Sequence, residues 1–390
     1  MNERDAWIVL ATTDQVGPET MAALIARYGT ARDVLDRGAA GELPALLAGE
    51  SVEAPGTRLT KPVRDGIAAW RSAGLARLER IAGLGLWAVT ALDPDYPAVL
   101  REIDPPPPLL LGSGDRSLLN APRLVALVGT RRPTPAGRWL AAQVAARLVE
   151  CQAVVVSGLA VGIDGVAHAT TLDRGGLTLG VIGGGHEHPG VRAHAPLRRR
   201  IVERGGAIVS EYAPQVEPTK GTYPQRNRII AALAEATIVI EAPARSGARI
   251  TAGLALSLGR PVFVAPGRVG DWATAGSLAL LRDTPARVLA GIDELTEDLG
   301  FFEPAPVAAT ADPAHPAEGE LPASGALALL GAAERAVAER LRRAPAGLDV
   351  LVNDTGLAPQ VVSSAVTLLL MRGWLQPVGP AYVAAGPLLR

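Results

Sequence analysis

The segment KGTYPQRNRIIAA (220–232) places an aromatic ring among several positive charges. The candidate residues for binding nucleic acid are Lys220, Tyr223, Arg226 and Arg228. Proteins that bind single strands use this combination, because cations follow the phosphate backbone while a ring stacks on a base. Asn227 could orient the loop or contact a phosphate oxygen. The same letters also fit a basic helix start with a packed tyrosine, so the segment alone leaves both interpretations open.

Three other segments combine glycine with small polar or basic residues where predicted strands give way to predicted helices. They are GTRRPTPAG (129–137), SGLAVGIDGVAH (157–168) and RSGARITAG (245–253). The free amides at a helix N-terminus attract anions, and arginine can bind phosphate through two parallel hydrogen bonds. The predicted contacts are Gly129, Thr130, Arg131, Arg132, Ser157, Gly158, Ser246 and Gly247. Alternatively, Arg131 and Arg132 lie on a solvated loop that binds no ligand.

The few histidines do not form a convincing metal site. The loop GGGHEHPG (183–190) is flexible enough for close backbone approach. It and the residues just after it supply His186, His188 and His194. A zinc site would need further cysteine or carboxylate ligands, and the chain has one cysteine. Asp164 and His168 lie four positions apart, where a structural hydrogen bond is favoured over a metal or acid–base pair. We expect no metal and no cofactor.

The distribution of charge matters more than its total. The chain of 390 residues has 38 basic and 39 acidic side chains and a net charge of −1, which alone argues against a nucleic-acid binder. Residues 120–230, however, carry 14 basic and 7 acidic groups, a net charge of +7. Residues 1–119 and 231–324 carry −4 and −6. Because local charge sets the attraction for a polyanion, the basic segment is the predicted binding region.

The elements that must position these residues alternate between strand and helix over residues 123–290. Predicted strands are 124–130, 153–158, 177–185, 207–211, 237–242 and 261–267. Continuous apolar strands separated by helices indicate an α/β fold with a doubly wound, Rossmann-like parallel sheet. Ligands of such sheets bind where the carboxyl ends of strands meet the following loops. The glycine segments all follow predicted strands, so we expect them to meet at one edge.

The rest of the chain divides into three further parts. Residues 1–55 predict a small helical domain. It resembles a helix-hairpin-helix or sterile-alpha-motif module, or it forms a plain helical cap. Residues 56–300 predict an extended Rossmann-like DNA-binding domain. Within the latter, four prolines at 105–108 predict an extended connector. Proline-rich residues 301–324 predict a flexible linker. Residues 325–390 predict a winged helix, whose second helix is too poor in charge to favour DNA over a protein partner.

Several function classes lack their motifs. There is no G-x-x-x-x-G-K-[ST] phosphate loop, no G-x-G-x-x-G after the first strand and no G-x-S-x-G elbow. No window of 18 uncharged apolar residues suggests a membrane span, and the start of the chain does not resemble a secretory signal. We therefore expect a cytoplasmic protein with no membrane partner.

The order and spacing of these motifs over about 160 residues resemble the DNA processing protein A family, also called Smf. The matching runs are VGTRRPTPAG, SGLAVGIDGVAH, GGGHEHP, IVSEY, YPQRNRII, IVIEAPARSGARITA and GRPVFVAPG. The resemblance implies a non-catalytic protein that binds and protects incoming single-stranded DNA in natural transformation. It also implies a partner, a RecA-type recombinase that the protein loads, and a homodimer formed through the Rossmann domain. Val161 and Gly190 stand where the family usually has basic residues, and Arg192 or Arg198–Arg200 could compensate.

Two other functions remain open at this point. A nucleotide-processing hydrolase on a Rossmann core could use Glu211 and Glu241, at strand ends, as acid or base. The P-G-G-x-G-T-x-x-E signature of nucleoside-monophosphate phosphoribohydrolases is missing, which weakens that alternative. A winged-helix transcription regulator with a ligand-sensing Rossmann domain is the third candidate, and the uncharged second helix argues against it.

Overall fold

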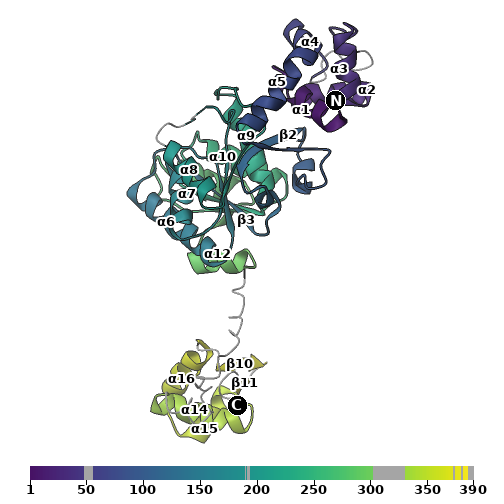
Figure 1. The fold of residues 1–390 in the computed structure, drawn as a ribbon. Helices are drawn as coiled ribbons and strands as arrows, with labels where there is room; N and C mark the ends of the chain where they lie inside the picture. Colours follow the sequence, from purple (N-terminus) through teal and green to yellow (C-terminus); the bar gives the residue numbers. More distant parts are fainter. Residues whose placement is uncertain are drawn as a thin grey trace, which may run out of the picture. The chain divides into compact units, whose positions relative to one another are not determined.

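The computed structural model describes residues 1–47, 56–188, 190, 194–301, 330–371, 374–378 and 381–384. By its internal contacts the chain separates into two units, residues 1–304 and 305–390. Each unit has its own hydrophobic cores. We describe them one at a time (Figure 1). Among the described residues, no helix is long and apolar enough to cross a membrane.

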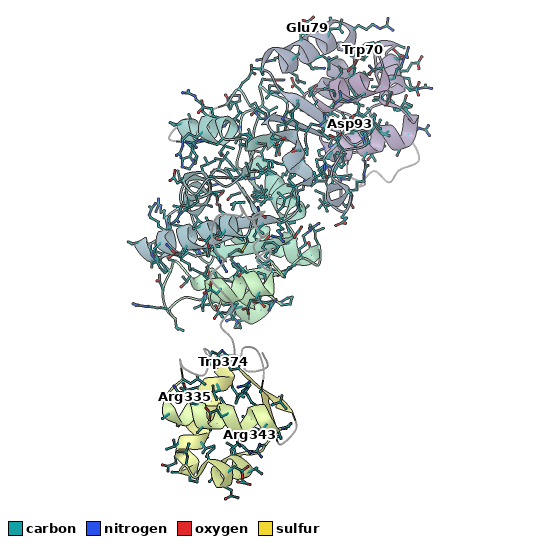
Figure 2. The ribbon with its side chains drawn as sticks, turned by 60° about the horizontal axis from the view of Figure 1, so that its bottom comes forward. Trp70, Glu79, Asp93, Arg335, Arg343 and Trp374 are labelled. Carbon is teal, nitrogen blue, oxygen red and sulfur yellow. The ribbon has the colours of Figure 1, made fainter. Side chains whose placement is uncertain are left out.

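The first unit begins with a group of short helices. They are α1 (Glu3–Ala11), α2 (Pro18–Tyr28), α3 (Ala31–Ala39), α4 (Lys61–Ala68) and α5 (Trp70–Gly83). Asn2 and Thr30 cap the N-termini of α1 and α3 through their side-chain oxygens. One core joins Leu24 and Leu35 to Ile67 of α4, so the helical packing continues past the predicted boundary at residue 55. Figure 2 labels Trp70 and Glu79 on α5 in this group.

The sheet that follows has nine strands in the order β1-β2-β6-β5-β4-β3-β7-β8-β9. Their bounds are β1 (Trp87–Thr90), β2 (Leu109–Gly114), β3 (Leu124–Gly129), β4 (Val154–Ser157), β5 (Thr178–Val181), β6 (Ala207–Ser210), β7 (Ala236–Ile240), β8 (Val262–Val264) and β9 (Arg287–Val288). Strands β3 to β9 pair in parallel, while β1 and β2 pair antiparallel. The predicted doubly wound α/β sheet is confirmed, with an antiparallel edge added.

The expected connector after the four prolines was therefore only partly right. The apolar run that begins at Leu109 is strand β2, which pairs with β6 over Leu111–Gly114. Prolines cannot donate to a ladder, which conceals a strand that begins directly after them. The helical domain is joined to this edge by Arg4, whose Nε lies 2.8 Å from Oδ1 of Asp93, and by the Trp7 indole N–H, which donates to Pro108 O. Asp93, which follows β1, is labelled in Figure 2.

Helices cover both faces of the sheet because its central strands are apolar at successive positions, so that apolar side chains point to both faces. They are α6 (Pro135–Glu150), α7 (Ile163–Asp173), α8 (Ala195–Glu203), α9 (Thr222–Leu233), α10 (Gly247–Ser257), α11 (Ala275–Asp283) and α12 (Ile292–Asp298), with 3₁₀ turns at Ala98–Arg101 and Arg116–Asn120. Val125 and Leu127 of β3 pack with α6, α7 and α12, whereas Ala126 and Val128 pack with α9, α10 and α11. The chain steps outward from β3 to β6, and α9 then returns it to β7, on the other side of β3.

The described residues of the second unit form three helices followed by a hairpin. Its elements are α14 (Ala332–Arg343), α15 (Leu348–Thr355), α16 (Pro359–Met371), β10 (Leu375–Val378) and β11 (Ala381–Ala384). The hairpin pairs antiparallel from Leu375 with Ala384 to Val378 with Ala381, which confirms the predicted winged helix. Figure 2 labels Arg335 and Arg343 on α14 and Trp374 before β10. The predicted linker 301–324 falls, apart from Phe301, outside the described residues.

Candidate nucleic-acid interface

A groove of about 530 Å³ opens at the point where the winding of the sheet reverses. The loop after β3 and the loop after β7 form two of its walls, and the start of α9 forms another. Adjacent strands whose connections run in opposite directions leave such a crevice at their carboxyl ends. The groove collects Gly129, Thr130, Arg131, Arg132, Lys220, Tyr223, Arg226, Asn227, Ser246 and Gly247. The structure thus brings together most of the residues singled out in the sequence.

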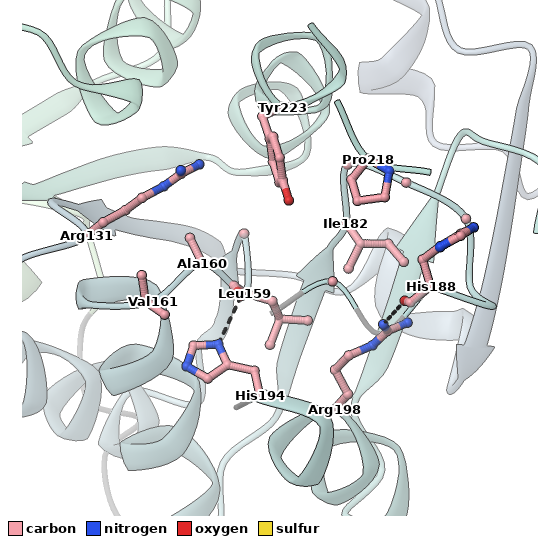
Figure 3. A pocket seen from close by; sticks show the side chains of 15 residues that line it. Arg131, Leu159, Ala160, Val161, Ile182, His188, His194, Arg198, Pro218 and Tyr223 are labelled. Carbon is pink, nitrogen blue, oxygen red and sulfur yellow. Dashed lines mark hydrogen bonds between the residues drawn. The ribbon is translucent and has the colours of Figure 1, made fainter. Parts of the chain in front are cut away.

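Tyr223 and Arg131 form a ridge between this groove and a second hollow. The guanidinium carbon of Arg131 lies 5.3 Å from the centre of the Tyr223 ring, within range of a cation–π contact. Both residues line the groove and also a smaller hollow of about 90 Å³. Figure 3 shows the Tyr223 hydroxyl pointing into that hollow, with Arg131 beside it. A base could stack on a ring placed in this way while its phosphate lies near the arginine.

The loop after β3 is built to hold its arginines outward. A side chain at Gly129 would overlap the carbonyl oxygen of Ile240, so the close approach of β3 and β7 requires glycine. Thr130 N donates to Glu241 O at 2.8 Å, and Thr134 N donates to the Glu241 carboxylate at 2.8 Å. The Thr134 hydroxyl accepts from Gly137 N and caps α6. Arg131 and Arg132, between these anchors, remain exposed.

Ser157 does not offer its hydroxyl to the groove. The side chain is fully buried, and its Oγ donates to Leu127 O at 2.7 Å. The amides that follow it are also occupied, since Gly158 N and Ala160 N donate to Asp164 Oδ2 at 3.2 and 3.4 Å. Burial raises the pKa of Asp164, and nearby Arg226 opposes the shift. Gly158 itself lines the smaller hollow.

Arg226 is an internal cation. Only 3% of the residue is exposed. Its Nη1 donates to Gly158 O at 2.6 Å and also to Val181 O. Burial lowers the pKa of the guanidinium, and the Asp164 carboxylate acts against that shift. Arg226 therefore links the residue after β4 to the last residue of β5, and it lines the groove as a buried side chain, whereas Lys220 is exposed.

Arg228 lies on another side of α9. Its guanidinium donates to Pro105 O at 2.9 Å and pairs with Glu211. Together they line a separate cavity of about 590 Å³ between the sheet domain and residues 11–20. Desolvation raises the pKa of Glu211 to about 7, although Arg228 opposes the change. The structure does not bring Arg228 to the groove.

Asn227 stays at the groove, partly turned toward α10. Its Nδ2 lies 3.4 Å from Gly247 O, a long hydrogen bond that links α9 to the start of α10. Ser246 is the N-cap of α10, yet its hydroxyl makes no capping hydrogen bond. The N-terminal turn of α10 thus faces the groove without a side-chain cap, beside exposed Gly247.

The histidines bind backbone carbonyls, as befits structural roles. His186 Nε2, His188 Nε2 and His194 Nδ1 lie 2.7 to 3.0 Å from the oxygens of Leu111, Gln215 and Leu159. The His168 ring is buried against the Thr178 hydroxyl at 2.7 Å, and desolvation lowers its pKa to about 3. No group of three His, Cys, Asp or Glu side chains suited to a metal occurs among the described residues.

The smaller hollow contains both positions where the family usually has basic residues. Val161 and Gly190 line it, and Arg198 of α8 lines it too, with its Nη1 donating to His188 O at 2.6 Å (Figure 3). Arg198 thus adds a positive group to this hollow beside Arg131. Arg192, the other suggested substitute, lies outside the described residues.

Sequence reasoning missed Arg245 and Trp272, which also line the groove. Arg245 begins the glycine segment 245–253, but its exposure depends on the loop after β7. Trp272 belongs to the loop after β8, where the sequence carries no glycine–basic motif. Neither Glu211 nor Glu241, on which the hydrolase alternative relies, lines the groove. Glu241 is instead hydrogen bonded to Thr134, which leaves that alternative without its acid or base at this site.

In the winged helix, α16 is the helix predicted to face a partner. Val361 and Leu368 are exposed on it, and an apolar groove of about 430 Å³ runs along it to the start of α14. The segment Pro359–Met371 contains no charged residue. Duplex readers place basic residues near the phosphates. The described surface of α16 agrees with the low charge noted in the sequence.

Comparison with known protein families covers most of the chain. The model for DNA recombination-mediator protein A matches residues 87–300, the DprA winged helix domain matches residues 321–379, and the DprA-like N-terminal HHH domain matches residues 1–63. The last match favours the helix-hairpin-helix interpretation of the first helices.

The curated relatives of this chain point to the same family as the family models. The putative DNA processing protein DprA of Mycobacterium tuberculosis is 39% identical over 255 residues, which are 65% of this chain and 62% of the relative. The chain thus spans less than two thirds of that relative. DprA of Bacillus subtilis is 35% identical over 215 residues, 55% of this chain and 72% of the relative.

Two solved structures resemble the fold. DprA from Streptococcus pneumoniae superimposes with a TM-score of 0.61 at 28% identity, covering 76% of this chain and 99% of the other. The second structure is described as showing the single-stranded DNA binding mode of DNA processing protein A from Helicobacter pylori. It superimposes with a TM-score of 0.50 at 29% identity and covers 55% of this chain and 95% of the other. With its sheet domain, helical start and winged helix all matched, the chain belongs to the DNA recombination-mediator protein A family.

Proposed function

We propose that this protein binds single-stranded DNA in the groove at the ends of β3 and β7 and acts in DNA processing during recombination. The observation that carries the proposal is the exposed positive charge around one aromatic ring. Arg131, Arg132, Lys220 and Arg245 are exposed in the groove walls beside Tyr223. Cations and a stacking ring in one groove suit a flexible strand whose bases are unpaired. The Helicobacter relative, described as binding single-stranded DNA, supports the same ligand.

The remaining parts of the proposal concern what the bound strand is for. We infer that the protein protects incoming strands in natural transformation and loads a RecA-type recombinase on them. It does so in the cytoplasm as a homodimer formed through its Rossmann domain, and without catalysis. The family membership supports these inferences. The uncharged, partly apolar surface of α16 fits a protein partner better than a second DNA duplex.

The binding proposal is tested with a fluorescent oligothymidylate and anisotropy at several salt concentrations. Arg131→Ala and Lys220→Ala should each weaken binding about tenfold, which is about 1.4 kcal/mol and lies in the lower part of the 1–3 kcal/mol range for a strong contact. Four cations predict a log–log salt slope of about −3 for a single strand. Arg204→Ala is the matched control, because Arg204 is an exposed arginine just before β6, at the opposite end of the strands. Unchanged affinity in both groove variants would refute the proposal.

The mediator role needs a separate assay. Recombinase filament growth is measured on strands already coated by a single-strand-binding protein, with and without this chain. The wild type should shorten the lag, and Lys220→Ala should lengthen it again. Sedimentation then reports the oligomeric state. Strand binding without any effect on the lag would leave the groove proposal standing and remove the loading role.

A further inference from the structure

Trp272 is an exposed indole in the wall of the groove. Sixty per cent of its surface is exposed, whereas Ala273 and Thr274, directly after it, are buried. It lines the groove together with Arg245 and Ile250. Single exposed apolar residues are common on protein surfaces. An indole fixed in the wall of a basic groove is different, because there it is placed to contact the groove's ligand.

The loop that carries Trp272 is anchored at both ends of the turn. Asp271 Oδ1 accepts from Ala273 N at 2.9 Å, and Asp271 O accepts from Thr274 N at 3.3 Å. Just beyond, Gly276 N and Ser277 N donate to Ala242 O at 2.7 and 3.0 Å, which fastens the loop to the end of β7. The backbone on either side of the indole is therefore held before any ligand arrives, and little ordering is needed on binding.

Groups suited to a phosphate lie in the same part of the groove. Arg245 is exposed, and Ser246 and Gly247 begin α10. The Ser246 hydroxyl oxygen is buried and lacks a hydrogen-bond partner, so the start of α10 carries a polar group that nothing in the described part of the chain satisfies. The groove thus has an exposed cation and an aromatic ring among its lining residues at the α10 side, Arg245 and Trp272, as it has Arg131 and Tyr223 at the other side.

We propose that Trp272 and Arg245 form a second base-binding subsite, in which an unpaired nucleobase stacks on the indole while Arg245 and the start of α10 hold its phosphate. The inference rests on the proposed binding of single strands and adds a specific contact to it. With rings at two walls, the groove holds two separate bases of one strand. Trp272 then contributes to affinity only for strands long enough to reach both rings.

The test compares Trp272→Ala, Trp272→Phe and Trp139→Ala in the full chain. Trp139 on α6 is 63% exposed but does not line the groove, so it is a matched control. Anisotropy is measured with oligothymidylates of about 4 and about 16 nucleotides, which span the usual range of single-strand site sizes. Trp272→Ala should weaken binding of the long strand about tenfold and of the short strand less than twofold. Trp272→Phe should keep most of the affinity, and Trp139→Ala all of it.

Indole fluorescence supplies a direct readout of stacking. Binding of the long strand should quench the emission of the wild type and of Trp139→Phe, and Trp272→Phe should lose most of the quenching. Wild-type affinity and quenching in the Trp272 variants would overturn the subsite. If Lys220→Ala still weakened binding about tenfold in that case, the proposed function would stand without the subsite. A shift of Trp272→Ala from dimer to monomer in sedimentation would also overturn the subsite and assign the indole to contact between copies.

Discussion

Replacing Arg226 by alanine should mainly lower the free energy of unfolding, because Arg226 is buried and does not offer its charge to a DNA strand. The change removes a buried guanidinium that donates to Gly158 O and Val181 O. It also leaves the Asp164 carboxylate, itself buried, without its main opposing charge. Hydrogen bonds from a charged donor contribute about 1.5–3 kcal/mol each, and removing one partner of a buried charge pair costs about 3–5 kcal/mol. The lost hydrogen bonds and the broken charge pair are partly the same interaction, so their energies are not added. We expect the free energy of unfolding to fall by about 3–5 kcal/mol.

Such a loss is a large share of the roughly 5–15 kcal/mol by which domains are stable. Urea unfolding of the full chain followed by circular dichroism measures it for the first unit. Hydrogen exchange of peptides from β4 and β5 shows whether the protection is lost where Arg226 binds. Arg226→Lys keeps a charge but lacks the planar fork that reaches two carbonyls, so it should recover only part of the stability.

Arg245→Ala is the matched control, because Arg245 is exposed in the same groove. It should change the free energy of unfolding by less than about 0.5 kcal/mol, as surface substitutions usually do, while weakening strand binding. The reasoning is refuted if Arg226→Ala unfolds at the wild-type urea concentration and yet binds strands poorly. Arg226 would then be the DNA-contacting cation that the sequence pattern suggested.

Three further outcomes follow from other parts of the first unit. Gly129→Ala should destabilise it by about 1–3 kcal/mol in thermal melts, because a methyl group would overlap the Ile240 carbonyl oxygen and force β3 from β7; an unchanged melting temperature would contradict this. The raised pKa of Glu211, about 7, means that the folded state holds a proton that the unfolded state has released, so stability should fall as pH rises from about 4.5 to 7, by at most about 1.4 kcal/mol per pH unit. Glu211→Gln should remove that slope in urea titrations at several pH values. Arg80→Ala breaks a half-exposed pair with Glu187 and should cost less than about 1 kcal/mol, so a larger loss by urea titration would show that the pair anchors the glycine loop.

The sequence alone was sufficient for the architecture of the central domain. Apolar runs alternating with helical segments predicted its parallel strands, because a strand covered on both faces needs no polar side. Glycine at Gly129 and the segments around Ser157 and Ser246 marked strand ends, and carboxyl ends of parallel strands share one edge. The exceptions were β1, β2 and the two-residue strand β9, none of which was among the predicted strands. The four prolines before Leu109 hid β2, an antiparallel strand that only its pairing with β6 reveals.

Only the tertiary structure decided which charged residues face the groove. Arg226 and Arg228 are two positions apart on α9, and at about 100° per residue their side chains leave the helix in nearly opposite directions. The sequence shows both as basic, but the packing of α9 across the sheet buries one and turns the other toward Glu211. Trp272 joins Tyr223 in one groove only because the loop after β8 is fastened to the end of β7. Residue type and spacing set what a side chain can bind, whereas its exposure depends on contacts between segments far apart in the chain.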